Sequence, residues 1–455
     1  MRERLTPARL LLLSFLGLIS AGTVGLKVLP GLYTGETLSW LDALFTATSA
    51  VCVTGLIVVD TATYFTIWGQ AFLLLLIQLG GLGILTFATL ALLAVGRRLS
   101  LHHEALSADM TDVLPDVNPR HMVKHLVIFT FALEGLGALV LFILWLGPFP
   151  PTEALWHSLF HAISAFCNAG FSTFSDSLTG FGGSALTLLV VMGLIVLGGL
   201  GFLTLEEIRS LSPPRCTVRS FRGLSLHSRL VLTMTGGLLV GGWVLFLFLE
   251  GTNVLQGFSP LDRVANGMFM SVTARTAGFN TVDYGATADP TNFLSILLMS
   301  VGGSPGSTAG GLKTTTVAVI GLLAWARLRG DREANAWGRS VPDETVHRSV
   351  GLFVLMFGTM TVGVLFLTLL EPAEMSSAPV QRGFLAQMFE VVSAFNTVGL
   401  SMGVTSHLTG MAKAVTILLM FVGRVGPLVV ATALAREKSY ERNGFRFSHE
   451  DVMIG

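Results

Sequence analysis

Four short polar segments, each closing on or just after a glycine, recur between long apolar stretches of this sequence. They read TSAVCVTGL (48–56), SAFCNAGF (164–171), SVTARTAGFN (271–280) and SAFNTVGLS (393–401). Ion-selectivity filters replace the water around a cation with backbone carbonyl oxygens. Carbonyl groups of successive residues turn inward only in backbone conformations that disfavour a side chain, and glycine adopts these readily. Four such segments in one polypeptide predict a cation pore lined by main-chain oxygen atoms.

We expect the three residues that end at each anchoring glycine to form the pore wall, and we call each triplet a filter segment. The filter segments are Val53, Thr54 and Gly55; Asn168, Ala169 and Gly170; Thr276, Ala277 and Gly278; and Thr397, Val398 and Gly399. Their side chains are unequal and the first segment is the least polar, so the predicted ring is only pseudo-four-fold. We expect no bound metal beyond the transported ion.

A serine lies six residues before the glycine in three of the segments. These serines are Ser49, Ser164 and Ser393, whereas the third segment has Val272 at that position and Thr273 beside it. The short helix that leads into the third segment is therefore expected to end differently.

Composition indicates a membrane protein. Hydrophobic residues make up 52% of the 455 residues and charged residues only 12%, with a formal net charge of zero. Apolar runs long enough to cross a bilayer cover about 8–28, 67–95, 125–147, 185–207, 229–249, 292–323, 350–370 and 412–435. Shorter stretches at about 38–48, 153–166, 261–273 and 381–395 suit re-entrant half-helices.

The fold expected from this order is an all-α integral membrane protein. Four pseudo-symmetric repeats of helix, pore half-helix and helix surround a central pore. The repeats are placed at 1–98, 99–210, 211–330 and 331–440, with a broken second helix at 302–313 in the third and a cytoplasmic tail at 441–455. Lys and Arg gather at the N-terminus, in every second loop and in the tail, which by the positive-inside rule places both termini in the cytoplasm.

A second motif follows each filter segment in the same register. Gly80, Gly198, Gly302 and Gly423 lie 25, 28, 24 and 24 residues after the anchoring glycines. Two readings stay open here. These glycines belong to the repeated pore unit, or they are small-residue contacts between spanning helices.

The segments NAGF, TARTAGFN and NTVGLS, together with GGSPGSTAGGLKTTT (302–316) and GRVGP (423–427), resemble the Trk/Ktr/HKT superfamily of potassium transporters. The similarity is greatest to its bacterial Ktr-type membrane subunit. It implies potassium uptake at the plasma membrane of a bacterium, a homodimer, and a cytoplasmic KtrA-like regulatory ring that binds the nucleotide (ATP or ADP) in place of this chain. Gly55 at the first filter position favours potassium over sodium, since a serine there accompanies sodium selectivity in some relatives.

The sixth span cannot be one helix. It contains six glycines and prolines between Gly302 and Gly311, and each glycine costs a helix about 1 kcal/mol and each proline about 3 kcal/mol. We expect a loop at 303–312 that crosses the cavity below the filter and acts as a gate, as the intramembrane loop of the resembled family does. The expected gate residues are Gly303, Ser304, Gly306, Ser307, Thr308, Gly310, Gly311, Lys313 and Arg424. Arg424 lies in the apolar core of the last span and is expected to donate hydrogen bonds to carbonyl groups of this loop.

Other classes of function are weighed against this one. A secondary transporter with broken helices usually shows two interruptions in corresponding halves, whereas we expect four filter segments and a single break. No nucleophile or zinc-protease motif favours an enzyme, and nothing indicates nucleic-acid binding. Glu134, Gln78 and Glu390 lie in or near apolar segments, where hydrogen bonds to helix ends or a direct role in permeation are the alternatives. Coupling to sodium or protons and the degree of selectivity stay open.

Overall fold

Four long apolar helices form the frame of the molecule, and each begins one repeat. They are α1 (Pro7–Val28), α5 (Pro119–Trp145), α10 (Leu226–Glu250) and α14 (Asp343–Leu370). The computed structural model describes residues 7–83, 119–210, 221, 223–371, 383–427, 429 and 430. At about 1.5 Å per residue these helices are long enough for the roughly 30 Å of bilayer hydrocarbon. Mean hydropathy of 1.8 to 2.4 over their spanning windows suits them to that environment.

Four shorter helices begin after the frame helices and end at the filter segments. They are α2 (Trp40–Val51), α6 (Pro151–Phe166), α11 (Pro260–Thr273) and α15 (Phe384–Phe395). α2 and α11 each begin after a serine whose hydroxyl accepts a backbone N–H of the first turn. The N–H of Asp42 donates to Ser39 over 3.1 Å, and the N–H of Asp262 donates to Ser259 over 3.3 Å. At 12 to 16 residues they are too short to cross the hydrocarbon. They are the pore half-helices of an all-α membrane fold.

The second helices of the repeats are short or interrupted. They comprise the helix Ile67–Gly83, the pair α7 (Ala185–Gly199) and α8 (Phe202–Ser210), the pair α12 (Asp289–Met299) and α13 (Thr314–Arg329), and α16 (Gly410–Val425). Residues 300–313 form the expected loop between α12 and α13. The ends of the predicted spans 67–95 and 412–435 lie outside the described residues, as do the repeat boundaries near 98 and 440 and the tail 441–455.

The expectation of a single break is wrong. The predicted span 185–207 is bent by 101° between α7 and α8, at Gly201 with φ +85°. A methyl group on Gly201 would lie 2.5 Å from the carbonyl oxygen of Pro305 in the loop 300–313. The fourth span therefore breaks where the broken sixth span presses against it.

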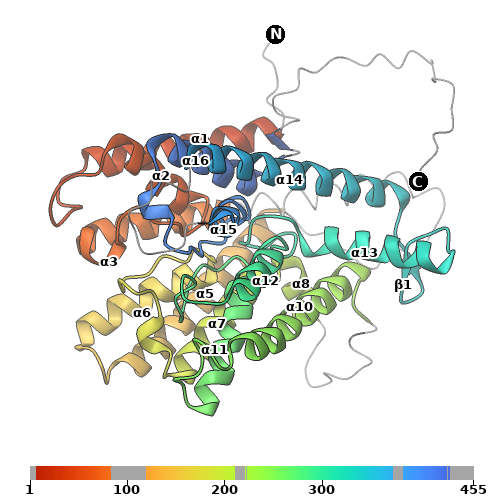
Figure 1. Ribbon diagram of the computed structural model, residues 1–455, viewed down its shortest axis with the longest axis horizontal. Helices are drawn as coiled ribbons and strands as arrows, with labels where there is room; N and C mark the ends of the chain where they lie inside the picture. Colours follow the sequence, from red (N-terminus) through yellow and green to blue (C-terminus); the bar gives the residue numbers. More distant parts are fainter. Residues whose placement is uncertain are drawn as a thin grey trace, which may run out of the picture.

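The remaining elements are small. They are α3 (Thr61–Tyr64), the 3₁₀ turns η1 (Thr179–Phe181) and η3 (Thr405–His407), and the antiparallel strands β1 (Asn335–Ala336) and β2 (Arg339–Ser340). The β1–β2 hairpin lies beyond the end of α13, far from the half-helices (Figure 1). Within the described residues these are the only paired strands, so the fold is helical as expected.

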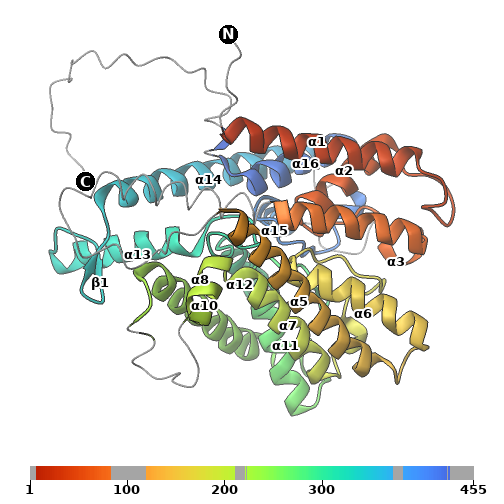
Figure 2. The ribbon, with the colours of Figure 1, turned by 180° about the vertical axis from the view of Figure 1, so that it is seen from behind.

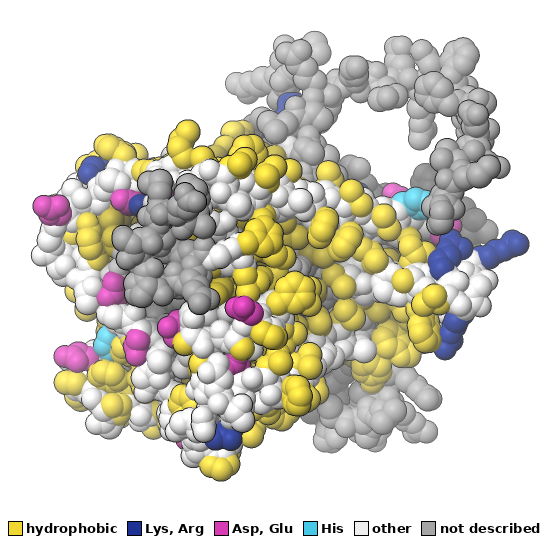
Figure 3. All heavy atoms as spheres, viewed as in Figure 1, with side chains coloured by type: hydrophobic (Ala, Val, Ile, Leu, Met, Phe, Trp, Pro, Cys, Tyr) yellow, Lys and Arg dark blue, Asp and Glu magenta, His cyan; other side chains and the backbone are white. Residues whose placement is uncertain are grey.

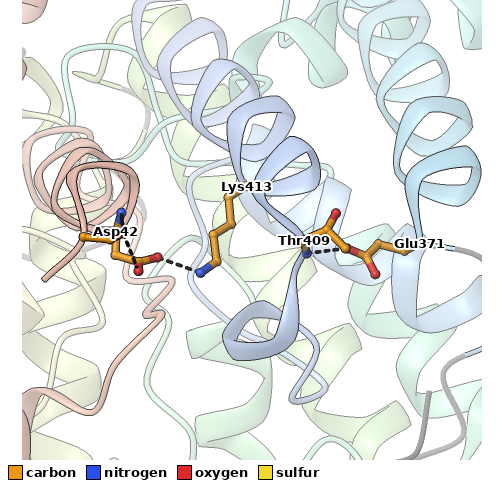
Figure 4. Close-up of polar contacts among 5 residues, drawn as sticks. Asp42, Glu371, Thr409 and Lys413 are labelled. Carbon is orange, nitrogen blue, oxygen red and sulfur yellow. Dashed lines mark hydrogen bonds and ion pairs between the residues drawn. The ribbon is translucent and has the colours of Figure 1, made fainter. Parts of the chain in front are cut away.

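The last repeat closes against the first. α16 packs on α2, and α14 packs on both α15 and α16; α1, α14 and α16 run side by side in both ribbon views (Figure 2). Lys413 Nζ of α16 lies 2.6 Å from Asp42 Oδ1 of α2, and the nearby backbone N–H of Thr409 donates to the carboxylate of Glu371 (Figure 4). An ion pair between residues so distant in sequence joins the two ends of a ring of repeats.

The surface suits a bilayer. Hydrophobic side chains cover the middle of the face shown in Figure 3, whereas acidic side chains gather toward its left end and Lys and Arg toward its right end beside the hairpin. α14 alone exposes nine large apolar side chains, among them Val354, Phe357 and Leu369. Such a band is the expected boundary with lipid.

Candidate ion-conduction site

The four anchoring glycines form a closed ring. A methyl group built on Gly55, Gly170, Gly278 or Gly399 would lie 2.4, 2.8, 2.5 or 2.3 Å from the carbonyl oxygen of Ala169, Ala277, Val398 or Thr54, respectively. Each glycine therefore faces the main-chain oxygen that precedes the glycine of the next repeat, and the fourth repeat returns to the first. The structure brings all four filter segments together at one axis, with no space for a side chain at any of the four glycines.

The backbone of the filter segments repeats one conformation. The anchoring glycines have φ between +70° and +94°, and the residue two places earlier is also left-handed, with φ of +56° at Val53, +58° at Asn168, +66° at Thr276 and +51° at Thr397. Residues other than glycine rarely adopt this region, particularly β-branched ones. The same strained pattern recurs at all four places, including the apolar first segment. Strain of this kind persists only where the surroundings enforce it.

Hydroxyl groups at the ends of the half-helices hold the filter segments from behind. Ser49 and Ser164 each donate over 2.7 Å to the carbonyl oxygen of the residue after the anchoring glycine, and Thr273 does the same in the third repeat. In the fourth repeat the N–H of Gly399 donates to Ser393 over 3.1 Å. We call these four residues the inner hydroxyls. The third half-helix does end differently, because Thr273 is five residues before its glycine instead of six.

The second glycine motif has a packing reason. A methyl group on Gly80, Gly198 or Gly423 would lie 2.0, 2.0 or 1.6 Å from the carbonyl oxygen of the last half-helix residue in its own repeat, Val51, Phe166 or Phe395. Glycine is required there because the second helix crosses the end of the half-helix in direct backbone contact. Gly302 departs from this pattern and faces the carbonyl oxygen of Gly310 at 2.2 Å.

The loop 300–313 is fixed by its own backbone and by the broken fourth span. Gly302 N–H donates to Leu312 over 2.7 Å, and the N–H groups of Ser304 and Thr308 donate to the carbonyl groups of Gly199 and Gly198 over 3.0 and 3.2 Å. In return, Phe202 N–H donates to Gly306 over 3.0 Å. Non-helical backbone at membrane depth is tolerated when its polar groups are satisfied inside the protein, and the ends of α7 and α8 provide those partners.

The same loop lies directly against the filter. A methyl group on Gly310 would lie 2.1 Å from the hydroxyl oxygen of the filter residue Thr397, and one on Gly311 would lie 2.5 Å from the amide oxygen of Asn396. Lys313, at the start of α13, turns back and donates from Nζ to the carbonyl oxygen of Ala309 over 2.6 Å. Pro305 of this loop is only partly buried. The expected gate residues around it are all buried, and they are Gly303, Ser304, Gly306, Ser307, Thr308, Gly310 and Gly311.

Two buried arginines hold the loop. Arg424 donates from Nη1 to the carbonyl oxygen of Thr308, as its position in the last span predicts. Arg275 donates from Nη2 to the carbonyl oxygen of Gly302 over 2.6 Å. Arg275 is not among the site residues predicted from the sequence. Its signal is a positive charge three residues before Gly278, because the other repeats have Cys52, Cys167 and Asn396 at that position.

Further polar groups surround the filter. The buried hydroxyls of Thr54, Thr276 and Thr397 have no hydrogen-bond partner among the described residues. Gln78 Nε2 lies 3.2 and 3.1 Å from the two carboxyl oxygens of Glu134. Both side chains also accept from the thiol of Cys167, at the C-terminal end of α6, over 3.5 and 3.8 Å. Nowhere in the described part of the chain do three or more His, Cys, Asp or Glu residues gather as metal ligands. Cys52 and Cys167 are buried free thiols, and Cys216 lies outside the described residues.

Comparison with known proteins decides the family. The TrkH family, described as cation transport protein, matches residues 21–443. The chain belongs to this family. The resemblance found in the sequence is thereby confirmed, and the family's proteins are ion transporters, not enzymes.

Relatives within the family match over nearly their whole length. The potassium/sodium uptake protein NtpJ of Enterococcus hirae is 35% identical, over 100% of this chain and 98% of its own. Ktr system potassium uptake protein B is 37% identical in Bacillus subtilis, over 99% and 97%, and 38% in Vibrio alginolyticus, over 98% and 94%. The crystal structure of the potassium transporter TrkH from Vibrio parahaemolyticus shares the fold, with a TM-score of 0.75 at 20% identity over 95% of this chain and 86% of that one.

Proposed function

We propose that this protein takes up potassium across the plasma membrane of a bacterium, through the ring of carbonyl oxygens formed by the four filter segments. The observation that supports it most directly is the closed circle in which each anchoring glycine faces a main-chain oxygen of the next repeat. Oxygens arranged around one axis replace the hydration shell of a cation. Relatives named as potassium uptake proteins, which match almost the entire chain, support potassium as the ion.

The loop 303–312 is the proposed gate. It lies against Thr397 and Asn396 on one side and is held by Arg424 on the other. A cation that has left the filter would meet the guanidinium group in a poorly hydrated space, where repulsion between like charges is strong. Conduction requires the loop and Arg424 to move away from the axis. Gly306 (φ +71°) and Gly311 (φ +66°) are the backbone positions in the loop at which its direction changes.

Regulation is proposed to come from outside this chain. The relatives named as Ktr system proteins are parts of a multi-component system by their names, which supports a cytoplasmic nucleotide-binding ring acting on a homodimer of this chain. Both termini would then lie in the cytoplasm and the filter segments would open to the exterior. The basic residues beside the β1–β2 hairpin, which include Arg332 and Arg339, would lie on the ring's side of the membrane.

Two alternatives remain within the same class. One is a proton-coupled transporter of the Trk type, and the other is a less selective monovalent cation channel. Sodium as a second ion is favoured by the relative named as a potassium/sodium uptake protein.

Ion flux in liposomes tests the proposal. The purified protein is reconstituted and the uptake of potassium, rubidium and sodium is compared, with and without the regulatory ring, against protein-free liposomes. Potassium and rubidium are expected to enter faster than sodium, and the ring is expected to change the rate. Equal sodium flux would support the less selective channel, and flux that requires a proton gradient would support the Trk-type alternative. No cation flux from correctly folded protein, with or without the ring, would contradict the proposal.

A second experiment addresses the gate. Deleting residues 305–309 removes the part of the loop that contains the carbonyl group bonded to Arg424. The deletion is expected to raise potassium flux in the absence of the ring. Flux that stays at the low level of the parent protein, in a variant with unchanged helix content, would contradict gating by the loop.

A further inference from the structure

One position in each half-helix lies a full helical turn before the inner hydroxyl. These four positions are Thr46, His161, Met270 and Glu390. Two of them are ionisable and almost completely buried, since 0% of His161 and 2% of Glu390 is exposed. Ionisable side chains are rare at membrane depth unless they have a specific partner and a function.

Glu390 holds the chain that leaves the fourth filter segment. The hydroxyl of Ser401 donates to its Oε1 atom, and the hydroxyl of Thr405 donates to Oε2 over 2.9 Å. Ser401 in turn accepts the N–H of Gly403 over 2.9 Å. The carboxyl group thus fixes a turn that begins two residues after Gly399, because it accepts hydrogen bonds from two hydroxyl groups of that turn.

His161 does the same in the second repeat. Its Nδ1 lies 2.8 Å from the carbonyl oxygen of His157 and its Nε2 lies 2.9 Å from the hydroxyl of Ser172. A carbonyl group only accepts, so Nδ1 is the donor, and Nε2 of a neutral ring accepts the Ser172 proton. Trp145 and Phe174 enclose the imidazole, with ring centroids 5.3 and 4.7 Å away.

The two contacts occupy the same register. Ser172 and Ser401 are each the second residue after an anchoring glycine, and the corresponding residues of the first and third repeats are Ile57 and Asn280. The glycine ring runs through the repeats in chain order, so the second and fourth repeats face each other across the axis. Among the described residues, a half-helix side chain therefore holds this position at two opposite points of the ring, in the second and fourth repeats. In the third repeat Asn280 is held instead from the second repeat: its N–H donates to Ser177 over 3.2 Å and its carbonyl group accepts the N–H of Leu178 over 3.0 Å.

We propose that His161 and Glu390 are positioning residues that set the width of the filter and thereby its preference for potassium over sodium. The inference rests on the proposed function. The inner hydroxyls fix the residue directly after the glycine in the first three repeats and Gly399 itself in the fourth. The His161–Ser172 and Glu390–Ser401 contacts fix the second residue after the glycine. Without them the strained filter backbone is free to relax inward, and a narrower ring coordinates the smaller sodium ion better.

Single substitutions that keep the fold test this role. Ser401→Ala and Ser172→Ala remove the donor of each contact, Glu390→Gln keeps one acceptor oxygen, and His161→Phe keeps a planar ring without a nitrogen. Thr46→Val is the matched control, because Thr46 has the same register in the first repeat and its hydroxyl has no partner among the described residues. The measurement is the ratio of rubidium to sodium uptake in proteoliposomes.

We expect Ser401→Ala and His161→Phe to lower this ratio about tenfold, the equivalent of the roughly 1.4 kcal/mol of one hydrogen bond involving a charged or buried group. The ratio of rubidium to sodium uptake in Glu390→Gln should lie between the ratios of Ser401→Ala and the parent protein. The ratio in Thr46→Val should equal that of the parent. A ratio unchanged in Ser401→Ala, Ser172→Ala and His161→Phe would overturn the inference while leaving potassium uptake intact. Absence of selective flux in the parent protein would instead overturn the proposed function. If His161→Phe does not accumulate, the two serine variants decide the outcome.

Discussion

Arg275 donates a hydrogen bond from Nη2 to the carbonyl oxygen of Gly302, at the first turn of the loop between α12 and α13, over 2.6 Å. Arg424 donates to Thr308 near the middle of the same loop. The first arginine comes from the third filter region and the second from the last span. Two guanidinium groups from different repeats therefore hold one loop beneath the filter, each with further nitrogen atoms that have no partner among the described residues.

Arg275→Gln is expected to raise potassium flux several-fold. The substitution removes a charge-assisted hydrogen bond to the start of the loop, worth about 1.5–3 kcal/mol. Flux in proteoliposomes without the regulatory ring measures the effect. Arg263→Gln is the matched control, since Arg263 lies in the first turn of α11, the half-helix that leads to Arg275, and donates to Leu255 and Gln256. Equal flux in the two variants would show that Arg275 does not hold the loop.

Arg424→Gln is expected to raise flux at least as strongly, because its guanidinium group bonds to Thr308 near the middle of the loop, whereas Arg275 bonds to Gly302 at its start. Lys413→Gln neutralises a cation at the opposite end of the same helix, where Lys413 pairs with Asp42, and should leave flux unchanged. Since both arginines act on one loop, the effects of Arg275→Gln and Arg424→Gln should not add. If the increases in flux of the two single variants add in the double variant, the two arginines oppose potassium flux independently.

Much of the architecture is predictable from the sequence because its repeats use glycine for a physical reason. The anchoring glycines mark the ring, and the half-helices follow from apolar stretches too short to cross the membrane. The second glycine motif left two readings open. Contact within each repeat decides between them, since Gly80, Gly198 and Gly423 touch the half-helix of their own repeat.

The break at Gly201 was not predictable in the same way. The string LGGLG occurs at both 79–83 and 197–201, and nothing local shows that the second copy ends a helix. The bend depends on Pro305, which comes more than a hundred residues later and whose carbonyl oxygen occupies the space beside Gly201. The pairing of Glu390 with Ser401 depends likewise on how the chain returns after the filter, and the sequence indicates only that a buried carboxylate needs donors.

Gly278→Ser and Gly399→Ser are expected to abolish most of the preference for potassium over sodium. The new Cβ atoms would lie 2.5 Å from the carbonyl oxygen of Val398 and 2.3 Å from that of Thr54, at φ values of +81° and +94°. Those oxygens have to move, which disrupts the ring. Gly31→Ser is the control, since Gly31 also has positive φ (+76°) but open space around it. Unchanged rubidium-to-sodium ratios in both filter variants would contradict a carbonyl-lined filter.

Gly198→Ala is expected to lower the thermal unfolding temperature in detergent. Its methyl group would lie 2.0 Å from the carbonyl oxygen of Phe166 and 3.1 Å from the hydroxyl of Thr308, so α7 has to shift away from the end of α6. Overpacking of this kind costs about 1–3 kcal/mol. Gly193→Ala, on the same helix with no atom near its Cβ position, should be neutral or slightly stabilising because alanine favours helix. The carbonyl group of Gly198 also accepts the N–H of Thr308 in the loop. The shift of α7 should therefore loosen the loop, so we expect higher potassium flux in the same variant that has the lower unfolding temperature. A variant that unfolds earlier but conducts as the parent would show that the loop does not depend on α7 for its position.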